Sequence, residues 1–261
     1  MSQGLDKAKR IIAQSGNTFH CKVLKYLKEK DWTVLICPYY NDNVSSKPRE
    51  IDLIAEKAFD AKDGCGTFLG TVNVKLFIEC KYIPQETVFW FHDKDELKAT
   101  ELVNQMIPKG NGHPSIMKHH YLAGVDRVAK LFADERKNSA DNEIFYKALN
   151  QCLNAMVYYR NKESIIKLPP GRNGYVLKII NYPIIVCNSF NDLYRVEIGT
   201  DTGPSKISED FLLEVNYAYM TSDGNNRNEY FLIDILNFGS FDIFLEKIEE
   251  DTAVVSRFLS S

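Results

Sequence analysis

The sequence has no long apolar run and no recognisable secretory signal. None of its apolar stretches approaches the roughly 20 residues that a membrane-spanning helix needs. The first ten residues, MSQGLDKAKR, lack the apolar segment of a signal peptide. We therefore expect a cytoplasmic protein that makes no contact with a membrane.

Paired cysteines are also missing. The six cysteines are scattered along the chain, with no CxxC pair and no clustering with the five histidines. This spacing indicates neither a zinc site nor a disulfide framework. We expect reduced thiols that are mostly buried.

A strong excess of charge is absent from the chain as a whole. The net charge of −3 argues at first against a nucleic-acid partner. Residues 1–30, however, carry seven basic side chains and two acidic ones, a balance of +5, whereas residues 201–261 are acidic. Because salt screens surface charges beyond about 8 Å, a local basic face is sufficient to bind phosphates. The alternative is an ordinary solvated helix face rich in lysine.

The composition is that of a globular protein with a large core. The 261 residues are 44% apolar and 26% charged. The spacing of apolar residues predicts an amphipathic helix over residues 17–30, capped by Asn17 or Thr18. Alternation and β-forming residues predict a buried strand over 33–40, a turn or loop over 41–48, a strand over 49–57, a glycine-rich loop over 62–70 and a strand over 72–82.

The rest of the chain continues this mixture of helices and strands. We expect an insertion at about 84–140, with a strand, a helix, a loop at HPSIMKHH and a short helix at YLAGVDRVAKLF. A helix capped by Asp141 or Asn142 is predicted over 141–162, a breaker over 169–174 and a strand over 176–189. A C-terminal extension at about 191–261 adds strands at 194–198, 212–220 and 230–236 and a helix near 241–251. The prediction is a single α/β domain over 1–261, with a mixed central sheet flanked by helices.

The stretch FIECKY, residues 77–82, places charged side chains at the end of an apolar strand. Alternate residues of a strand face the same side, so Glu79 and Lys81 share a face, and Glu50 and Asp52 share a face of the preceding strand. If the two strands are neighbours, Asp52, Glu79 and Lys81 converge. Two carboxylates are costly to bury together unless a cation lies between them, and hard divalent cations prefer such oxygen ligands.

The acid-x-lysine pattern is weak by itself, since it also occurs at residues 60–62, 96–98 and 135–137. The copy at 79–81 differs because it ends a run of β-forming residues, VKLFI, and follows a strand with an acid in an apolar setting, IDLIA. The alternative is an exposed ion pair on an edge strand, worth about 0–1 kcal/mol, in a globular interaction protein.

This order of elements and acids resembles the PD-(D/E)XK nuclease superfamily, the restriction-endonuclease-like fold. The resemblance covers about 1–82 and 141–190, with Asp52 as the first acid, Glu79 as the second and Lys81 as the lysine. Two positions depart from the pattern. Arg49-Glu50-Ile51 precedes Asp52 where proline is common, and Gly16-Asn17-Thr18-Phe19 is followed by His20 where many relatives have glutamate. In relatives with that glutamate, the helix can supply a ligand to a second metal ion, so His20 puts a second metal site in this chain in doubt.

The resemblance implies a Mg²⁺-dependent deoxyribonuclease, a hydrolase with DNA as its partner, of the kind found in restriction, phage defence or repair. Asp52, Glu79 and the backbone carbonyl of Cys80 would hold Mg²⁺, or Mn²⁺ in its place, with the Cys80 side chain in the core. Lys81 would orient the attacking water and stabilise charge in the transition state. Both a monomer and a homodimer remain open.

Each of the other candidate residues has a functional interpretation and a purely structural one. His20, Lys22 and Gln151 are substrate-binding candidates, and Gln151 resembles a glutamine that some relatives place near the metal, although it is otherwise a solvated helix residue. Trp90 and Phe91 either stack on a base or, as we favour, belong to the core. His113, His119 and His120 are either phosphate contacts or surface-loop histidines without function. The substitution by His20 also keeps open a catalytically inactive nuclease-like fold that binds nucleic acid or a protein.

Overall fold

The computed structural model describes residues 2–43, 45, 47–107, 116–134, 144–162, 164–166, 175–221 and 223–259. The helices are α1 (Ser2–Gln14), α2 (Asn17–Glu29), α3 (Glu96–Met106), α4 (His120–Ala123), α5 (Ile144–Tyr159) and α6 (Phe241–Leu259). The strands are β1 (Thr33–Ile36), β2 (Tyr39–Asn41), β3 (Pro48–Glu50), β4 (Leu53–Lys62), β5 (Phe68–Lys81), β6 (Thr87–Asp93), β7 (Arg127–Asp134), β8 (Val176–Cys187), β9 (Leu193–Glu197), β10 (Ser205–Lys206), β11 (Phe211–Met220) and β12 (Asn226–Asn237).

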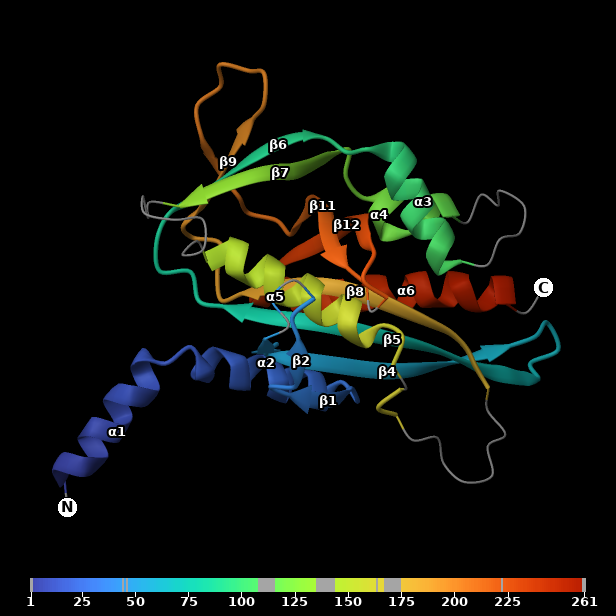
Figure 1. Ribbon diagram of the computed structural model, residues 1–261, viewed down its shortest axis with the longest axis horizontal. Helices are drawn as coiled ribbons and strands as arrows, with labels where there is room; N and C mark the ends of the chain where they lie inside the picture. Colours follow the sequence, from blue (N-terminus) through green and yellow to red (C-terminus); the bar gives the residue numbers. More distant parts are fainter. Residues whose placement is uncertain are drawn as a thin grey trace.

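Ten of these strands form one mixed sheet, in the order β1-β4-β5-β8-β12-β11-β7-β6-β9-β10 (Figure 1). Strand β5 pairs antiparallel with β4 and parallel with β8, and β8 pairs parallel with β12. Strands from the predicted insertion and from the C-terminal part therefore continue the sheet formed by the first part of the chain. A mixed α/β fold with a large central sheet flanked by helices is confirmed.

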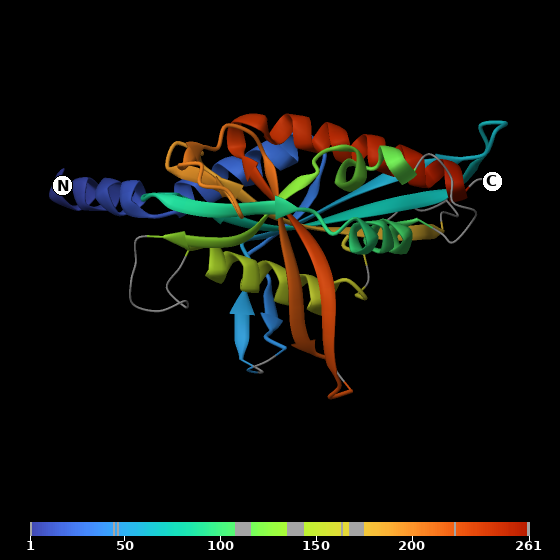
Figure 2. The same cartoon turned by 90° about the horizontal axis from the view of Figure 1, so that it is seen from above.

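Helices cover both faces of the sheet (Figure 2). On one face, which we call the α6 face, residues of helices α2, α3, α4 and α6 share one core with Leu76 and Ile78 of β5. On the other, the α5 face, helix α5 packs over Phe77. Because both faces are covered, β5 carries a nearly continuous apolar run instead of an alternating one.

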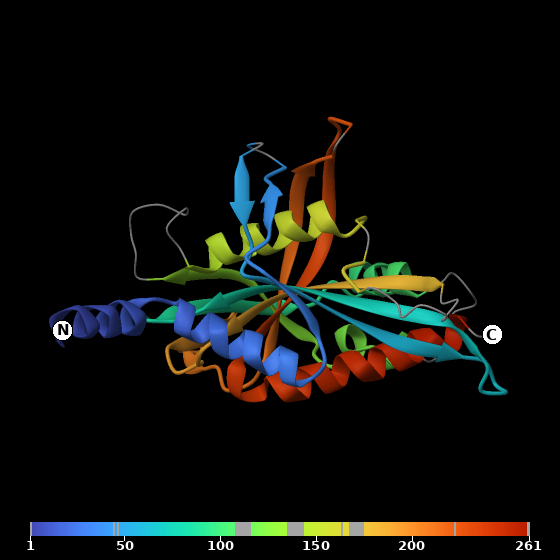
Figure 3. The same cartoon turned by 90° about the horizontal axis from the view of Figure 1, so that it is seen from below.

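Strands β2 and β3 form a separate two-stranded sheet on the α5 face. Tyr40 of β2 is buried in the core beneath α5, and the hydroxyl of Tyr159 on α5 donates to the carbonyl of Tyr39 at 2.5 Å. The far ends of β11 and β12 extend in the same direction past α5 (Figure 3). There the Tyr217 hydroxyl donates to Oδ1 of Asn150 on α5 at 3.3 Å.

The helix predicted over 17–30 is confirmed as α2, which buries Phe19, Val23 and Leu27. The predicted caps are wrong, because Asn17 is the first helical residue and Gly16 precedes it without a side-chain cap. No helix was predicted for α1. The expectation that most cysteines are buried is also wrong, since only Cys152 and Cys187 are fully buried and Cys21 and Cys65 are exposed. Within the described residues, no helix is long and apolar enough to cross a bilayer.

The buried strand predicted over 33–40 is wrong in both length and burial. Strand β1 lies at the edge of the large sheet with mostly exposed side chains, and Cys37 interrupts it with φ of +49°. A left-handed residue turns the chain out of the sheet, so β2 leaves to pair with β3. The strand predicted over 49–57 is divided for the same reason, between β3 and β4.

The helix predicted at YLAGVDRVAKLF is half wrong. Helix α4 ends at Ala123, and residues from Arg127 onward form strand β7. Strand β7 pairs with β6 and β11 and buries Val128 and Ala129, so tertiary pairing overrides the helical spacing. The predicted caps Asp141 and Asn142, the breaker at 169–174 and His113 lie outside the described residues.

Gly70 in β5 gives a test of the sheet. Its φ is +155°, and a Cβ atom there would lie 2.4 Å from the backbone oxygen of Tyr175. We expect Gly70→Ala to lower the free energy of unfolding by about 1–3 kcal/mol, measured by urea denaturation, because backbone must move. Gly64→Ala is the control, since nothing lies within 4 Å of its Cβ position. Equal stability of the two variants would contradict this packing.

Candidate metal and catalytic site

Asp52 and Glu79 lie opposite one another across two neighbouring strands. In the β4–β5 pair Leu53 is opposite Ile78, so the next position outward places Asp52 opposite Glu79. Both belong to the α5 face, because Ile54 and Phe77, two residues further along each strand, pack in the core beneath α5. Asp52 itself lies in the bend that precedes β4, so alternation within a strand fixes the face of Glu79, whereas Asp52 is positioned by the Cys80 N–H that it accepts.

Two short hydrogen bonds organise this place. The backbone N–H of Cys80 donates to Oδ2 of Asp52 at 2.7 Å, and Nζ of Lys81 donates to Oε2 of Glu79 at 2.6 Å. The Glu79 side chain is 1% exposed and that of Lys81 is 17% exposed. A buried carboxylate, a second carboxylate and an ammonium group therefore meet at the end of β5.

Burial governs the protonation of this group. It raises the pKa of Glu79 to about 8, the Asp52 charge adds to this effect, and the Lys81 ammonium opposes it. Burial acts to lower the pKa of Lys81, but Glu79 and then Asp52 outweigh it, so the net shift is upward. Lys81 is therefore held as a cation, suited to electrostatic stabilisation rather than to proton abstraction.

Two buried side-chain oxygens, one on β5 and one on α5, have no hydrogen-bond donor among the described residues. They are Oε1 of Glu79 and Oε1 of Gln151. Gln151 lies on α5, and its Nε2 donates to the backbone oxygen of Glu50 at 2.9 Å. Buried polar atoms normally have partners, and carboxylate and amide oxygens are ligands for hard divalent cations. This donor set fits Mg²⁺.

The backbone carbonyl of Cys80 has a suitable direction for a third ligand. In a β-strand the N–H and C=O of one residue point toward the same neighbouring strand. Since the Cys80 N–H points at Asp52, its carbonyl faces that side too. The Cys80 side chain packs against the core of the α6 face, as predicted.

Cys37 and Glu50 also belong to these surroundings, although sequence reasoning missed the thiol and gave Glu50 no role. Burial raises the pKa of the Cys37 thiol to about 11, and Glu50, Asp52 and Glu79 raise it further in that order. The backbone N–H of Cys37 donates to the Asp52 backbone oxygen at 2.9 Å. No spacing pattern in the sequence identifies Cys37, because its position depends on the left-handed turn after β1.

His20 and Lys22 lie on α2, which packs on the α6 face and not on the face of Glu79 and Lys81. His20 is half-buried and Lys22 is exposed. Neither forms a hydrogen bond or ion pair with Asp52, Glu79 or Lys81 in the described parts of the chain. Of the three substrate-binding candidates, Gln151 is the one with a hydrogen bond to the segment next to Asp52, through the backbone oxygen of Glu50.

The aromatic and histidine candidates lie in or near the core. Phe91 is buried and its ring centroid lies 5.4 Å from that of Phe211, which confirms the core interpretation, while Trp90 is half-buried. His119 is fully buried and His120 nearly so, so the surface-loop interpretation is wrong for both. Burial lowers the pKa of His119 to about 3. For His120, Asp234 and Asp251 outweigh burial and raise the pKa to about 9.

In comparisons with known proteins, no family model, no curated protein and no solved structure matches this chain. Its function must therefore be argued from its own residues.

Proposed function

We propose that this protein is a metal-dependent nuclease that hydrolyses DNA phosphodiester bonds. The observation that carries the proposal is the convergence of Asp52, Glu79 and Lys81 on one face of the sheet, with an unpaired Glu79 oxygen. An ion pair of surface side chains would not need a carboxylate that is 1% exposed. A buried acid beside a second, half-buried acid is costly for stability and is typical of functional sites.

The connectivity around these residues supports the same proposal. Helix α2, strands β1, β4 and β5, helix α5 and strand β8 follow one another in this order, and the four strands are neighbours as β1-β4-β5-β8. This is the helix, three strands, helix and strand order on which the resemblance to the PD-(D/E)XK superfamily depends. The acids lie just before β4 begins and where β5 ends, at one end of these two interior strands.

The roles of the side chains follow from their positions. Asp52, Glu79 and the Cys80 carbonyl would hold Mg²⁺, which when bound polarises a phosphate and makes water more acidic. Lys81 orients the attacking water and offsets the negative charge that develops on the phosphorus oxygens. Gln151, tied to Glu50, limits the movement of β3 beside the acids.

A cleavage assay tests the proposal directly. Purified protein is incubated with supercoiled plasmid and with linear DNA in Mg²⁺, Mn²⁺ or EDTA. We expect cleavage with either cation and none with EDTA. Salt-dependent DNA binding without cleavage in any cation would instead favour the inactive, nucleic-acid-binding alternative, for which His20 in place of an acid is the supporting observation.

The basic face of α2 gives a prediction on DNA binding. Lys22, Lys25 and Lys28 are exposed on this helix. If they contact phosphates, replacing all three by alanine weakens binding and flattens the slope of log K against log salt by about one unit per contact. Fluorescence anisotropy at several salt concentrations measures the slope, and Lys206→Ala on exposed strand β10 is the control. A slope equal to the wild-type value would assign this helix to plain solvated surface.

A further inference from the structure

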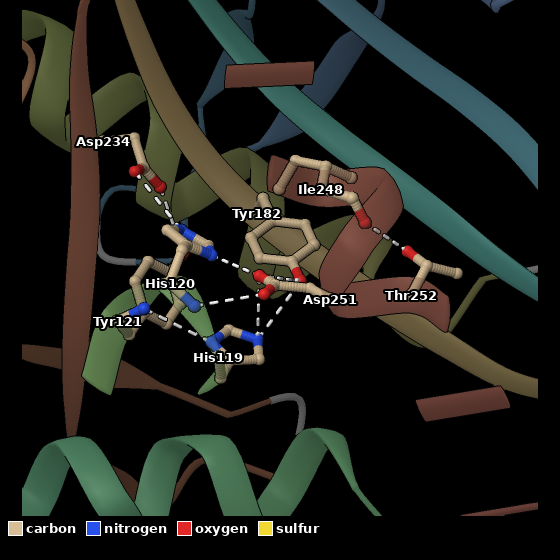
Figure 4. A network of polar contacts seen from close by, with 8 residues as sticks. All are labelled: His119, His120, Tyr121, Tyr182, Asp234, Ile248, Asp251 and Thr252. Carbon is tan, nitrogen blue, oxygen red and sulfur yellow. Dashed lines mark hydrogen bonds and ion pairs between the residues drawn. The ribbon is translucent and has the colours of Figure 1, made fainter. Parts of the chain in front are cut away.

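A second group of side chains that could bind a metal consists of His119, His120 and Asp251 (Figure 4). His119 precedes α4, His120 is its first residue, and Asp251 lies on α6. One ligand atom from each lies within 4.8 Å of the others. The surrounding Tyr121 and Tyr182 belong to the core of the α6 face, away from Glu79. The group therefore shares no residue with the proposed nuclease site.

The separations suit a small transition-metal ion. Nε2 of His119 lies 3.2 Å from Oδ2 of Asp251, and Nδ1 of His120 contacts the same oxygen. Bonds of about 2.0–2.1 Å in a tetrahedral site place ligand atoms roughly 3.3 Å apart. The His119–Asp251 edge already has this length, whereas the His120 ring is too close to the carboxylate and must move back to reach it.

Further polar groups surround the three side chains, most of them at distances longer than a normal hydrogen bond. Oδ1 of Asp234 lies 3.4 Å from Nε2 of His120, on the far side of the ring from Asp251. The Tyr121 hydroxyl donates to Oδ2 of Asp234 at 3.2 Å, and the Tyr182 hydroxyl lies 3.5 Å from Oδ2 of Asp251. Metal-bound histidines usually have such a carboxylate behind them, because it fixes the ring and leaves the other nitrogen for the metal.

The charges also balance with a divalent ion. Asp234 and Asp251 have side chains that are 7% and 2% exposed. When both histidines bind a metal as neutral imidazoles, the carboxylates of Asp234 and Asp251 leave a charge of −2, and burying such charge without a partner is costly. One divalent cation cancels it. Imidazole nitrogen with carboxylate oxygen is a ligand set typical of zinc and related metals rather than of magnesium.

The group lies beside a cavity. His120, Asp234 and Asp251 line a cavity of about 220 Å³, together with Asp210, Lys247 and Glu250. His119 is fully buried and is not among the residues that line this cavity. Three protein ligands with a cavity beside them leave room for a water molecule to complete a tetrahedron.

We propose that His119, His120 and Asp251 bind a divalent transition metal of the zinc class, which ties α4 to the C-terminal helix α6. The competing arrangement is a metal-free network in which His120 forms an ion pair with Asp251. In that network the Tyr121 N–H points at Nδ1 of His119 at 3.4 Å, longer than a normal hydrogen bond. Metal on Nε2 of His119 moves its proton to Nδ1 at the expense of this weak contact.

The test is Zn²⁺ binding by the full-length Asp52→Asn variant, which removes the other proposed cation site. After treatment with EDTA and dialysis, calorimetry is expected to show one Zn²⁺ per chain. Adding Asp251→Asn is expected to weaken binding by more than about 100-fold, and adding Asp234→Asn by about 10–100-fold, the usual effect of an outer partner. Glu250→Gln changes an acid that lines the same cavity but is not one of the proposed ligands; it is the control and keeps the affinity.

A second readout keeps the test decisive if Asp251→Asn folds poorly by circular dichroism. The imidazole ¹⁵N signals of two histidines in the Asp52→Asn variant are expected to shift with one equivalent of Zn²⁺ and to return with EDTA. Absence of Zn²⁺ binding, unchanged imidazole signals, or an affinity that survives Asp234→Asn and Asp251→Asn would overturn the proposal in favour of the metal-free network. None of these outcomes bears on DNA cleavage, so the two proposals fail separately.

Discussion

Lys81→Ala is expected to cleave DNA about 10²–10³ times more slowly than the wild-type protein, as is usual when one positioned donor to the transition state is removed. The Lys81 ammonium lies 2.6 Å from Glu79 and is held as a cation by the two carboxylates. Removing it takes away positive charge but leaves Asp52 and Glu79 in place. Metal binding and DNA binding should therefore survive, and single-turnover cleavage rates measure the loss.

Lys57→Ala is the matched control for that variant. Lys57 lies on the neighbouring strand β4 and, like Lys81, is partly buried in an ion pair with a glutamate, here Glu249 at 3.1 Å. Its partner is on α6, so it belongs to the other face of the sheet. Loss of this pair should leave the cleavage rate unchanged. If Lys81→Ala cuts DNA at the wild-type rate, the electrostatic role proposed for this lysine is wrong.

The proximity of Asp52 and Glu79 was predictable from sequence because it depends only on local rules. Alternation fixes the face of each side chain once a strand is identified, and a loop of a few residues makes two successive strands neighbours. The segments IDLIA and VKLFIECK are rich in β-forming residues, and they are close enough in sequence for their strands to form a hairpin. A one-residue shift in register would have moved Glu79 to the other face, and the observed pairing avoids it.

Other features depended on contacts between distant parts of the chain. The break at Cys37 arises because β2 leaves the large sheet to pair with β3, which no local pattern in TVLICPYY indicates. The apolar residues of β7 are spaced as in a helix, but pairing with β6 and β11 makes this segment a strand. Such pairings outweigh propensities of a few tenths of a kcal/mol per residue.

The His119–His120–Asp251 group shows the same limit for a site. The two histidines are visible in sequence as HH, but Asp251 lies in an ordinary acidic helix more than a hundred residues away. Nothing in FDIFLEKIEED distinguishes Asp251 from its exposed neighbours except its place on the apolar stripe of α6, between Ile248 and Val255. An acid within an apolar stripe was the one available signal.

Asp52→Asn is expected to abolish both cleavage and the stabilisation by Mg²⁺ while leaving the fold intact. The change removes a formal charge from the cation ligands but keeps the shape, and the amide oxygen of asparagine can still accept the 2.7 Å hydrogen bond from the Cys80 N–H. In wild-type protein, Mg²⁺ at 100 times its Kd stabilises the folded state by about 2.7 kcal/mol. That increment, seen as a rise in melting temperature, should disappear in the variant.

In EDTA the same variant should be at least as stable as the wild-type protein. The Asp52 charge helps to raise the pKa of Glu79, which means that the two carboxylates repel each other when no cation lies between them. Neutralising one relieves this repulsion, the usual exchange of function for stability at a strained site. Asp60→Asn, an exposed acid on the same strand, is the control and should keep both cleavage and the Mg²⁺ response. Mg²⁺ is the proper probe because the imidazole ligands near α6 favour transition metals. A wild-type Mg²⁺ shift in the melting of Asp52→Asn would show that the cation, and with it the proposed chemistry, belongs elsewhere in the molecule.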